Sequence, residues 1–372
     1  MGSSRQCENT EVIGHAGNRR VAAFFRQPSG RKIRRAGVEA TPLDRRNHRR
    51  SNPFPANLTT ATLPLTVNRR RSTTTTRGSC MSIPEILSAL TTPFDEDGAI
   101  DHESFARRLE DVAATLDGVF VAGTTGEFLA LDVTERAALA EQALEVLGPQ
   151  RVVIHVGSSS TRQSLEITER VAALGAIRFA AITPHYLAAS TAGITRHWEA
   201  IAKECGGELY GYVFPDVAVT DLAPADLPEV LESGITGLKV SGAASARVEE
   251  YLEAAPDGFK LWSGNDADLP ATMAAGGTGT VSGVSSAAPT LWQDLSRALA
   301  TQDAAAIAAA QQRIARLVPL LGPSIANIKH ALHRTTGEAS TCRMTIDQPD
   351  GEQIARIDQA LSDLDLLDMV TS

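Results

Sequence analysis

The chain is poor in cysteine and has no long apolar run. Its four cysteines show no paired spacing, and Cys7 and Cys80 lie within the first 80 residues, which excludes a disulfide framework and indicates a reducing compartment. No stretch reaches the roughly 18 apolar residues that a membrane-spanning helix needs, and no secretory signal follows Met1 or Met81. We therefore expect a cytoplasmic protein without a membrane partner.

Two further absences limit the cofactors. No Gly-x-Gly-x-x-Gly motif follows the first predicted strand, so a dinucleotide site has no support. The histidines show no metal-ligand spacing except at His330 and His333, three residues apart on a late predicted helix with no indicated carboxylate partner. We expect these two histidines to be structural, and we expect no metal.

Charge divides the sequence at Met81. Residues 1–80 hold 16 Lys and Arg against 4 Asp and Glu, whereas residues 81–372 hold 19 against 40. The basic segment lacks a sustained apolar period, which is typical of a disordered extension. Three interpretations are open: a nucleic-acid-binding arm, an organelle transit peptide, or sequence upstream of a true start at Met81. The lack of a recognisable fold or of interleaved aromatic residues argues against the first. The ordered pattern that begins near Met81 favours the last, and the acidic remainder argues against nucleic acid as a partner.

Short apolar runs alternate with amphipathic helical stretches after residue 81. Several runs are continuous, as in parallel strands covered on both faces. Eight strand–helix units in about 220 residues predict an α/β fold, a (β/α)₈ TIM barrel over residues 81–300, with a doubly wound open sheet as the alternative. The runs span residues 85–92, 118–122, 151–156, 177–183, 208–214, 235–240, 260–262 and 279–284.

Helix signals support this architecture. Asp132-Val-Thr-Glu135 has the pattern of a capping box, and Thr161 and Asp226 are expected N-caps. Three helical stretches without intervening strands, at residues 304–321, 324–334 and 351–367, predict a C-terminal helical extension over residues 301–372.

Lysine is rare, and one of the five lysines stands inside an apolar run. Lys239 lies between Leu238 and Val240 in the sixth predicted strand. A lysine removed from water loses its preference for the charged form, and a neutral amine attacks carbonyl groups, so Schiff-base chemistry is indicated. The alternative is a buried aliphatic stem whose ammonium group reaches water.

Polar residues follow several predicted strands, at the end of the barrel where chemistry occurs. Strand two ends in Gly123-Thr-Thr-Gly-Glu127, whose hydroxyl and N–H groups suit a carboxylate, although a glycine-rich turn with threonine caps has the same pattern. Thr183-Pro-His-Tyr186 follows strand four, strand five contains Tyr212, and Ser263-Gly-Asn-Asp266 follows strand seven. Two of the four tyrosines thus lie near the mouth expected for Lys239, which favours a site over a purely structural role.

Together with the Gly276-Gly-Thr-Gly-Thr-Val-Ser-Gly-Val284 stretch, these motifs resemble the dihydrodipicolinate synthase / N-acetylneuraminate lyase family. The resemblance covers residues 83–372 and none of the first 80. It implies a barrel with extra C-terminal helices, assembled as a homo-oligomer, usually a tetramer. It also implies a class I pyruvate-dependent aldolase that uses a covalent lysine imine with its substrate and no other cofactor.

The resemblance assigns catalytic roles to four residues. Lys239 would form the Schiff base with pyruvate or another 2-oxo acid, and Tyr212 would transfer protons as general acid and base. Thr124 would link Tyr212 to Tyr186 in a hydroxyl relay, with Tyr186 supplied by a neighbouring subunit.

Four further residues would bind substrate. Thr125 and its N–H group would hold the pyruvate carboxylate, and Gly123 would begin the turn that contains them. Gly264 and Val281 would line the pocket.

One position departs from the family pattern. Synthases of the family carry an arginine that binds the aldehyde's carboxylate, and Val217 occupies that position here, next to Asp216. We therefore expect reversible aldol cleavage or dehydration of a sugar-acid-like 2-oxo acid, with a small-molecule 2-oxo acid and an aldehyde as partners. The alternative is a 4-hydroxy-tetrahydrodipicolinate (dihydrodipicolinate) synthase that condenses pyruvate with aspartate semialdehyde. A non-catalytic 2-oxo-acid-binding paralogue is a third possibility, which the presence of Lys239, Tyr212 and the threonine pair disfavours.

Overall fold

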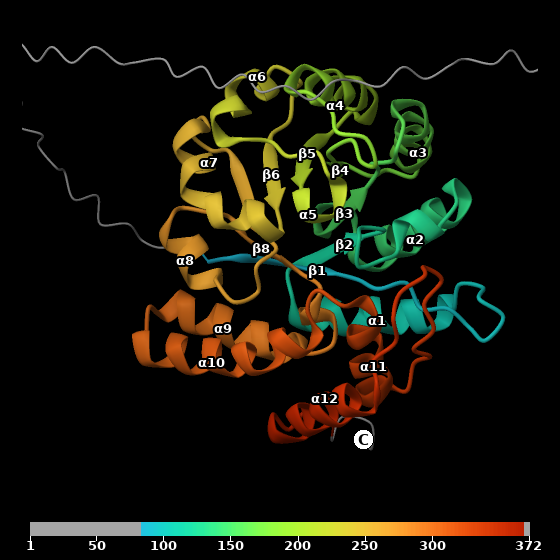
Figure 1. Cartoon of the computed structure of the whole chain (residues 1–372), viewed down its shortest axis with the longest axis vertical. Coiled ribbons are helices and arrows are strands. Elements are labelled where there is room, and N and C mark those ends of the chain that lie inside the picture. The colour runs from blue at the N-terminus through green and yellow to red at the C-terminus, as the bar shows by residue number, and fades with distance from the viewer. Residues whose placement is uncertain (1–82, 368–372) are drawn as a thin grey trace, which may run out of the picture. The chain divides into compact units, whose positions relative to one another are not determined.

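The computed structural model describes residues 83–367, so the expectation for residues 1–80 lies outside the described part of the chain. Eight parallel strands close into a barrel in chain order (Figure 1). The predicted (β/α)₈ barrel is confirmed, and the open sheet is wrong, because residue pairs from Glu85–Gly279 to Ser88–Ser282 join the first strand to the eighth. The strands are β1 (Glu85–Ala89), β2 (Gly118–Val121), β3 (Val152–His155), β4 (Arg178–Ile182), β5 (Glu208–Val213), β6 (Gly237–Val240), β7 (Lys260–Ser263) and β8 (Gly279–Ser282).

Each predicted strand is present, although several end earlier than the apolar pattern does. The run predicted over residues 85–92 ends as a strand at Ala89. Leu90, Thr91 and Thr92 are nevertheless buried. The apolar pattern therefore marks burial, which continues beyond the paired residues.

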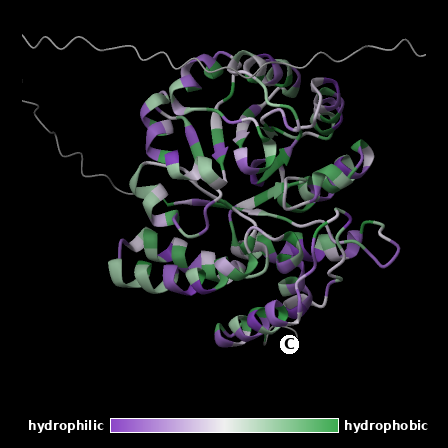
Figure 2. Cartoon of the chain, in the orientation of Figure 1, coloured by the Kyte–Doolittle hydropathy of each residue, from purple (hydrophilic) through white to green (hydrophobic). Residues whose placement is uncertain are grey.

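Helices surround the barrel and carry both hydrophilic and hydrophobic residues, whereas the strands from β1 to β4 are mostly hydrophobic (Figure 2). The helices between the strands are α1 (His102–Thr115), α2 (Val133–Leu147), α3 (Thr161–Ala173), α4 (Thr191–Cys205), α5 (Pro215–Ala218), α6 (Leu227–Leu231), α7 (Val248–Ala254) and α8 (Leu269–Ala274), and α9 (Pro289–Thr301) follows β8. Short 3₁₀ turns are η1 (Phe128–Ala130), η2 (Pro149–Arg151), η3 (Pro224–Asp226), η4 (Gly242–Arg247) and η5 (Val284–Ser286).

The observed N-caps can be compared with the three helix starts predicted from the sequence. The capping box of α2 is confirmed, because Asp132 accepts the Glu135 N–H and the Glu135 side chain accepts the Asp132 N–H. The Thr161 prediction is wrong by one residue: Ser160 caps α3, and Thr161 is already helical. Asp226 occupies the N-cap position of α6 but makes no capping hydrogen bond, because η3 leads directly into the helix.

Ionic side chains close the amino-terminal end of the barrel. Arg178 pairs with Glu85 at 2.8 Å, and Trp262 Nε1 donates to the same carboxylate at 2.9 Å. Lys260 pairs with Glu208 beside them, also at 2.8 Å. This end is filled, which leaves the carboxyl end for a site.

Three helices form the C-terminal extension: α10 (Ala304–Leu321), α11 (Ile325–Thr336) and α12 (Gly351–Asp363). They match the predicted stretches closely, and they gather near α9 and α1 on one side of the barrel (Figure 1). Within residues 83–367, no helix is long and apolar enough to cross a membrane.

Candidate active site

Lys239 projects into the barrel from β6. Its neighbours Leu238 and Val240 belong to the core between the strands and the helices, and side chains alternate along a strand, so Lys239 points the other way. Lys239 is 5% exposed, and its Nζ lies 4.0 Å from the ring centroid of Tyr212 and 4.4 Å from that of Phe120. The amine therefore lies beside two aromatic rings with little exposure to solvent, which disfavours the alternative of an ammonium group that reaches water.

Lys239 differs from the other lysines that the structure describes. Each of those has a carboxylate oxygen within 2.8 Å, whereas none is within ion-pair distance of Lys239 among residues 83–367. The pairs are Lys203–Glu199, Lys260–Glu208 and Lys329–Glu127. Lys239 is thus the described lysine whose amine has no ion-pair partner to hold it in the charged form.

Burial changes the acid–base behaviour of Lys239. Loss of hydration lowers the pKa of Lys239 to about 7, against the opposing charge of Asp266. A substantial share of the amine is therefore neutral near pH 7 and able to attack a carbonyl carbon.

Asp266 follows β7 and is buried, with its Oδ1 unpartnered among the described residues. Burial raises the pKa of Asp266 to about 7, although hydrogen bonds from Ser282 and Val284 and the charge of Lys239 lower it. The site therefore holds an amine and a carboxyl group that both change charge near neutral pH.

Tyr212 and Thr124 form a hydroxyl pair beside the lysine. The register of β5 and β6 sets Tyr212 opposite Lys239, and Tyr212 OH lies 3.2 Å from Thr124 Oγ1. Burial raises the pKa of Tyr212 to about 12, although hydrogen bonds with Thr124 and Ser241 lower it. The phenol is protonated at neutral pH and can donate a proton to a neighbouring oxygen.

These groups line a cavity of about 600 Å³ at the carboxyl end of the strands. Six of the eight predicted site residues contribute to its wall: Thr124, Thr125, Tyr212, Lys239, Gly264 and Val281. Gly123 does not line the cavity. Any side chain at Gly123 would meet the Phe120 ring at 2.6 Å, so a glycine is required there for the turn to pack against β2.

Tyr186 lies apart from this group. It follows β4, has a φ of 74°, is 84% exposed and is not part of the cavity wall. A direct role for Tyr186 in its own subunit has no geometric support, so its predicted entry from a neighbouring subunit stays a prediction.

The structure also adds residues to which the sequence assigned no role. Ser241 and Asp266 line the cavity: Ser241 directly follows β6, and Asp266 ends the Ser263–Asp266 motif after β7. Ile325 and Ile328 of α11 form another part of the wall. No local pattern could have found them, because α11 lies far from the barrel strands in sequence.

The position that departs from the family pattern is also in the cavity wall. Val217 lies in α5 and is 50% exposed, and Asp216 beside it accepts the Ala243 N–H at 2.9 Å. Among the described residues that line the cavity, Lys239 is the only cation. The nearby Arg247 is held by both oxygens of Asp221.

A closed (β/α)₈ barrel with a buried lysine that lacks an ion-pair partner, at the carboxyl end of a strand, has the architecture of a class I aldolase, a lyase that works through a lysine imine. Comparison with known proteins agrees. The dihydrodipicolinate synthetase family matches residues 82–363, and the chain belongs to that family.

Several relatives extend this assignment. The 4-hydroxy-tetrahydrodipicolinate synthase of Exiguobacterium is 32% identical over 246 residues, which cover 65% of this chain and 83% of the relative. YagE, a prophage protein of the same family from E. coli K12 solved with pyruvate, has a TM-score of 0.70 at 26% identity and covers 76% of this chain and 99% of its own. A catalytic-lysine mutant of the sialic acid aldolase of Ruminococcus gnavus shares the fold, with a TM-score of 0.70, 20% identity, and coverage of 76% of this chain and 95% of its own.

Proposed function

We propose that the enzyme forms an imine between Lys239 and pyruvate or a related 2-oxo acid, and that it catalyses reversible aldol cleavage or dehydration of a sugar-acid-like 2-oxo acid. The observation that carries the proposal is the enclosed, unpaired amine of Lys239 next to the Tyr212 ring. The non-catalytic alternative is disfavoured by the hydrogen-bonded pair of Tyr212 and Thr124 beside that amine.

The chemistry follows from these groups. The neutral amine attacks the keto carbon, and the hydroxyl of the resulting carbinolamine leaves as water after it takes a proton from Tyr212. The Tyr212 oxygen then takes a proton from the methyl carbon of the iminium, which gives an enamine whose carbon attacks an aldehyde. The aldehyde oxygen takes this proton from Tyr212 as the new carbon–carbon bond forms, and the nitrogen is again an iminium. Water then adds to the iminium carbon and gives up a proton to Tyr212, and the product leaves as the amine of Lys239 re-forms. Cleavage runs through the same steps in reverse.

Thr125 is proposed to hold the carboxylate of the 2-oxo acid. It lines the cavity with Lys239, and its hydroxyl and its backbone N–H group would both be donors for a carboxylate. A fixed carboxylate orients the neighbouring keto carbon toward the amine, which lowers the entropic barrier to imine formation.

The rest of the cavity favours a neutral, hydroxylated second substrate. Asp216, Asp266 and Asn265 contribute acceptors to the wall, and Val217 replaces the family's arginine. A second carboxylate there would lack a bidentate cation and would lie near like charge. Hydroxyl groups of a sugar-like aldehyde, in contrast, would find acceptors.

A second candidate function is 4-hydroxy-tetrahydrodipicolinate synthesis from pyruvate and aspartate semialdehyde. The observation that favours it is the name of the curated relatives, such as the Exiguobacterium enzyme at 32% identity. Both candidates share the lysine imine and differ in the aldehyde. Condensation assays with aspartate semialdehyde and with a panel of neutral hydroxyaldehydes separate them.

We also propose that the enzyme is a homodimer or homotetramer. Tyr186, Leu187 and Leu129 are 84%, 74% and 59% exposed. Their neighbours His185 and Phe128 are in ring contact at 5.7 Å, so the three exposed side chains lie on adjoining loops. Cover by a second copy would remove this apolar surface from water.

Borohydride trapping tests the imine. Sodium borohydride with pyruvate is expected to add one reduced pyruvyl group to Lys239, mapped by mass spectrometry, and Lys239→Arg is expected to abolish the adduct because a guanidinium stays protonated. Lys260→Arg is the matched control, since Lys260 lies at the opposite end of a neighbouring strand and pairs with Glu208. An adduct on Lys203, Lys260 or Lys329 in place of Lys239 would contradict the assignment.

A further inference from the structure

The turn that carries Thr124 and Thr125 has an unfavourable backbone. Ala122 and Glu127, which flank it, have φ values of 52° and 56°, a region that residues with a side chain rarely adopt. At Gly126, an added Cβ would lie 3.1 Å from Leu90 O and 3.2 Å from Ala122 Cα, so the turn is closely packed as well. Surrounding structure must hold such a conformation in place.

The side chain of Glu127 links the turn to the C-terminal extension. Its side chain is fully buried, and Oε1 lies 2.5 Å from Nζ of Lys329, whose side chain is 2% exposed. Its Oε2 accepts the backbone N–H groups of Arg343 and Met344 at 2.9 and 2.8 Å. Every one of these donors comes from the C-terminal extension, and Lys329 also donates to Thr341 O at 2.6 Å, which ties the same segment together.

The turn and α11 also meet in the cavity wall. Gly283 lies between them: a Cβ there would be 3.1 Å from Thr125 Oγ1 and 3.3 Å from Ile328 Cδ1. Ile328 precedes Lys329 on α11 and lines the cavity with Thr125. One helix therefore supplies both an apolar wall of the site and the cation that anchors its carboxylate-binding turn.

We infer that Glu127 and Lys329 are positioning residues for catalysis, which hold Thr124 and Thr125 where the substrate carboxylate and Tyr212 require them. The inference rests on the proposed imine chemistry and adds a requirement to it: the C-terminal extension is needed for tight binding of the 2-oxo acid. Neither residue lines the cavity, so they act through the turn.

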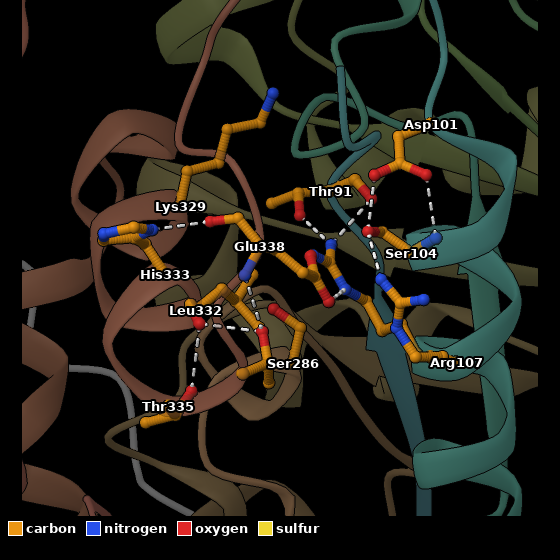
Figure 3. A network of polar contacts seen from close by, with 12 residues as sticks. Thr91, Asp101, Ser104, Arg107, Ser286, Lys329, Leu332, His333, Thr335 and Glu338 are labelled. Atoms are coloured by element: carbon orange, nitrogen blue, oxygen red, sulfur yellow. Dashed lines mark hydrogen bonds and ion pairs between the residues drawn. The ribbon is translucent and has the colours of Figure 1, made fainter. Parts of the chain in front are cut away.

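A second buried ion pair provides a control inside the same molecule. Arg108 of α1 pairs with Glu338, with side chains 3% and 4% exposed, and Arg108 Nη1 donates to Thr91 O at 2.9 Å. Figure 3 shows Glu338 between α11, which carries Lys329 and His333, and Thr91 after β1. This pair also joins the extension to the barrel, but among residues 83–367 neither of its side chains hydrogen-bonds to the turn at residues 123–127.

The test compares two double variants that each remove both charges, so that no unpaired ion stays buried. Glu127→Gln/Lys329→Met removes the anchor of the turn, and Arg108→Met/Glu338→Gln removes the control pair. The apparent dissociation constant for pyruvate is measured from the concentration dependence of borohydride trapping, and the melting temperature is measured in parallel. In the first variant, misplacement of the turn is expected to raise the apparent dissociation constant for pyruvate on the order of tenfold to a hundredfold. In the second variant this dissociation constant is expected to stay unchanged. Both variants are expected to have a lower melting temperature.

A third variant keeps the test valid if the first does not fold. Thr92→Val removes the 2.8 Å hydrogen bond from Thr92 Oγ1 to Gly126 O, a neutral support of the same turn, and is expected to raise the pyruvate constant by a smaller factor. The inference would be overturned if the folded turn variants kept the wild-type dissociation constant for pyruvate, or if the Arg108→Met/Glu338→Gln control raised it equally. In either case the wild-type adduct would still support the imine. Absence of a wild-type adduct would overturn both proposals.

Discussion

At the scale of single residues, the chemistry depends on how burial changes two neighbouring charges. Lys239 could be predicted from the sequence because a lysine between Leu238 and Val240 breaks an apolar run and must enter the barrel. Asp266 could not be assigned a role, because its effect on Lys239 arises only when the ends of β6 and β7 are brought together. Its sequence neighbours indicate a polar loop and nothing more specific.

The first prediction concerns the pH dependence of imine formation. The pKa of Lys239 is about 7, so the rate of trapping with pyruvate should rise with pH through a midpoint near 7 and level off at higher pH, where nearly all of the amine is neutral. The charge of Asp266 favours the ammonium form, so Asp266→Asn should lower the pKa of Lys239 and move the midpoint of the profile to lower pH. Trapping rates across pH 5–9 measure both midpoints, and a shift to higher pH in Asp266→Asn would contradict the interpretation.

A second prediction at this scale concerns the aldehyde. Wild-type enzyme should use aspartate semialdehyde poorly, because a desolvated charge pair lacking one partner costs about 2–5 kcal/mol, or roughly 30- to several-thousand-fold in kcat/KM. Val217→Arg should raise kcat/KM for this aldehyde and leave pyruvate trapping unchanged. Val219→Arg is the matched control, since Val219 is exposed in the same loop but does not line the cavity.

Wild-type kinetics decide this point. Efficient condensation of pyruvate with aspartate semialdehyde by the unmodified enzyme would favour the synthase candidate instead. It would require another cation to bind the aldehyde's carboxylate, because Arg247 is engaged by Asp221 at 2.6 and 3.0 Å.

At the scale of secondary-structure elements, the sequence predicted order and type better than ends and contacts. All eight strands and the three C-terminal helices were found, because continuous apolar runs and helical periodicity are local signals. The Thr161 cap was displaced by one residue because Ser160 and Thr161 are adjacent and chemically equivalent as caps. The anchor between Glu127 and Lys329 was not predictable, since 202 residues separate the two side chains in sequence.

The third prediction concerns the loop after β4. If Tyr186 enters the site of a neighbouring subunit, a mixture of Tyr186→Phe and Lys239→Arg proteins should regain activity when subunits exchange, since some mixed sites would be complete. A mixture of Tyr212→Phe and Lys239→Arg is the control: both side chains come from one chain's cavity, so no complete site can form. Lack of recovery in the first mixture, despite exchange verified by mass spectrometry, would mean that Tyr186 has no role across an interface.

At the scale of the whole molecule, the fold that supports the site is contained in the family-matched region. The barrel closes through β1 and β8, and the extension contributes Ile325, Ile328 and the anchor of the turn, all between residues 83 and 367. The family match covers residues 82–363, the same part of the chain. Every contact invoked above for binding or catalysis therefore lies after Met81, apart from those expected from a second subunit.

The fourth prediction follows for a protein that starts at Met81. It should keep the melting temperature of the full chain, because closure of the sheet, both core clusters and the two buried ion pairs are formed by residues that it retains. It should also keep the pyruvate trapping rate, since Lys239, Tyr212 and the turn at residues 123–127 are unchanged. Thermal unfolding and trapping kinetics of the two proteins, measured side by side, check both expectations.

A protein that starts at Leu90 is the control. It lacks β1, so β2 and β8 lose the strand that lies between them and the barrel should not close. A large loss of stability or trapping in the Met81 protein alone would show that residues 1–80 contribute to the folded enzyme.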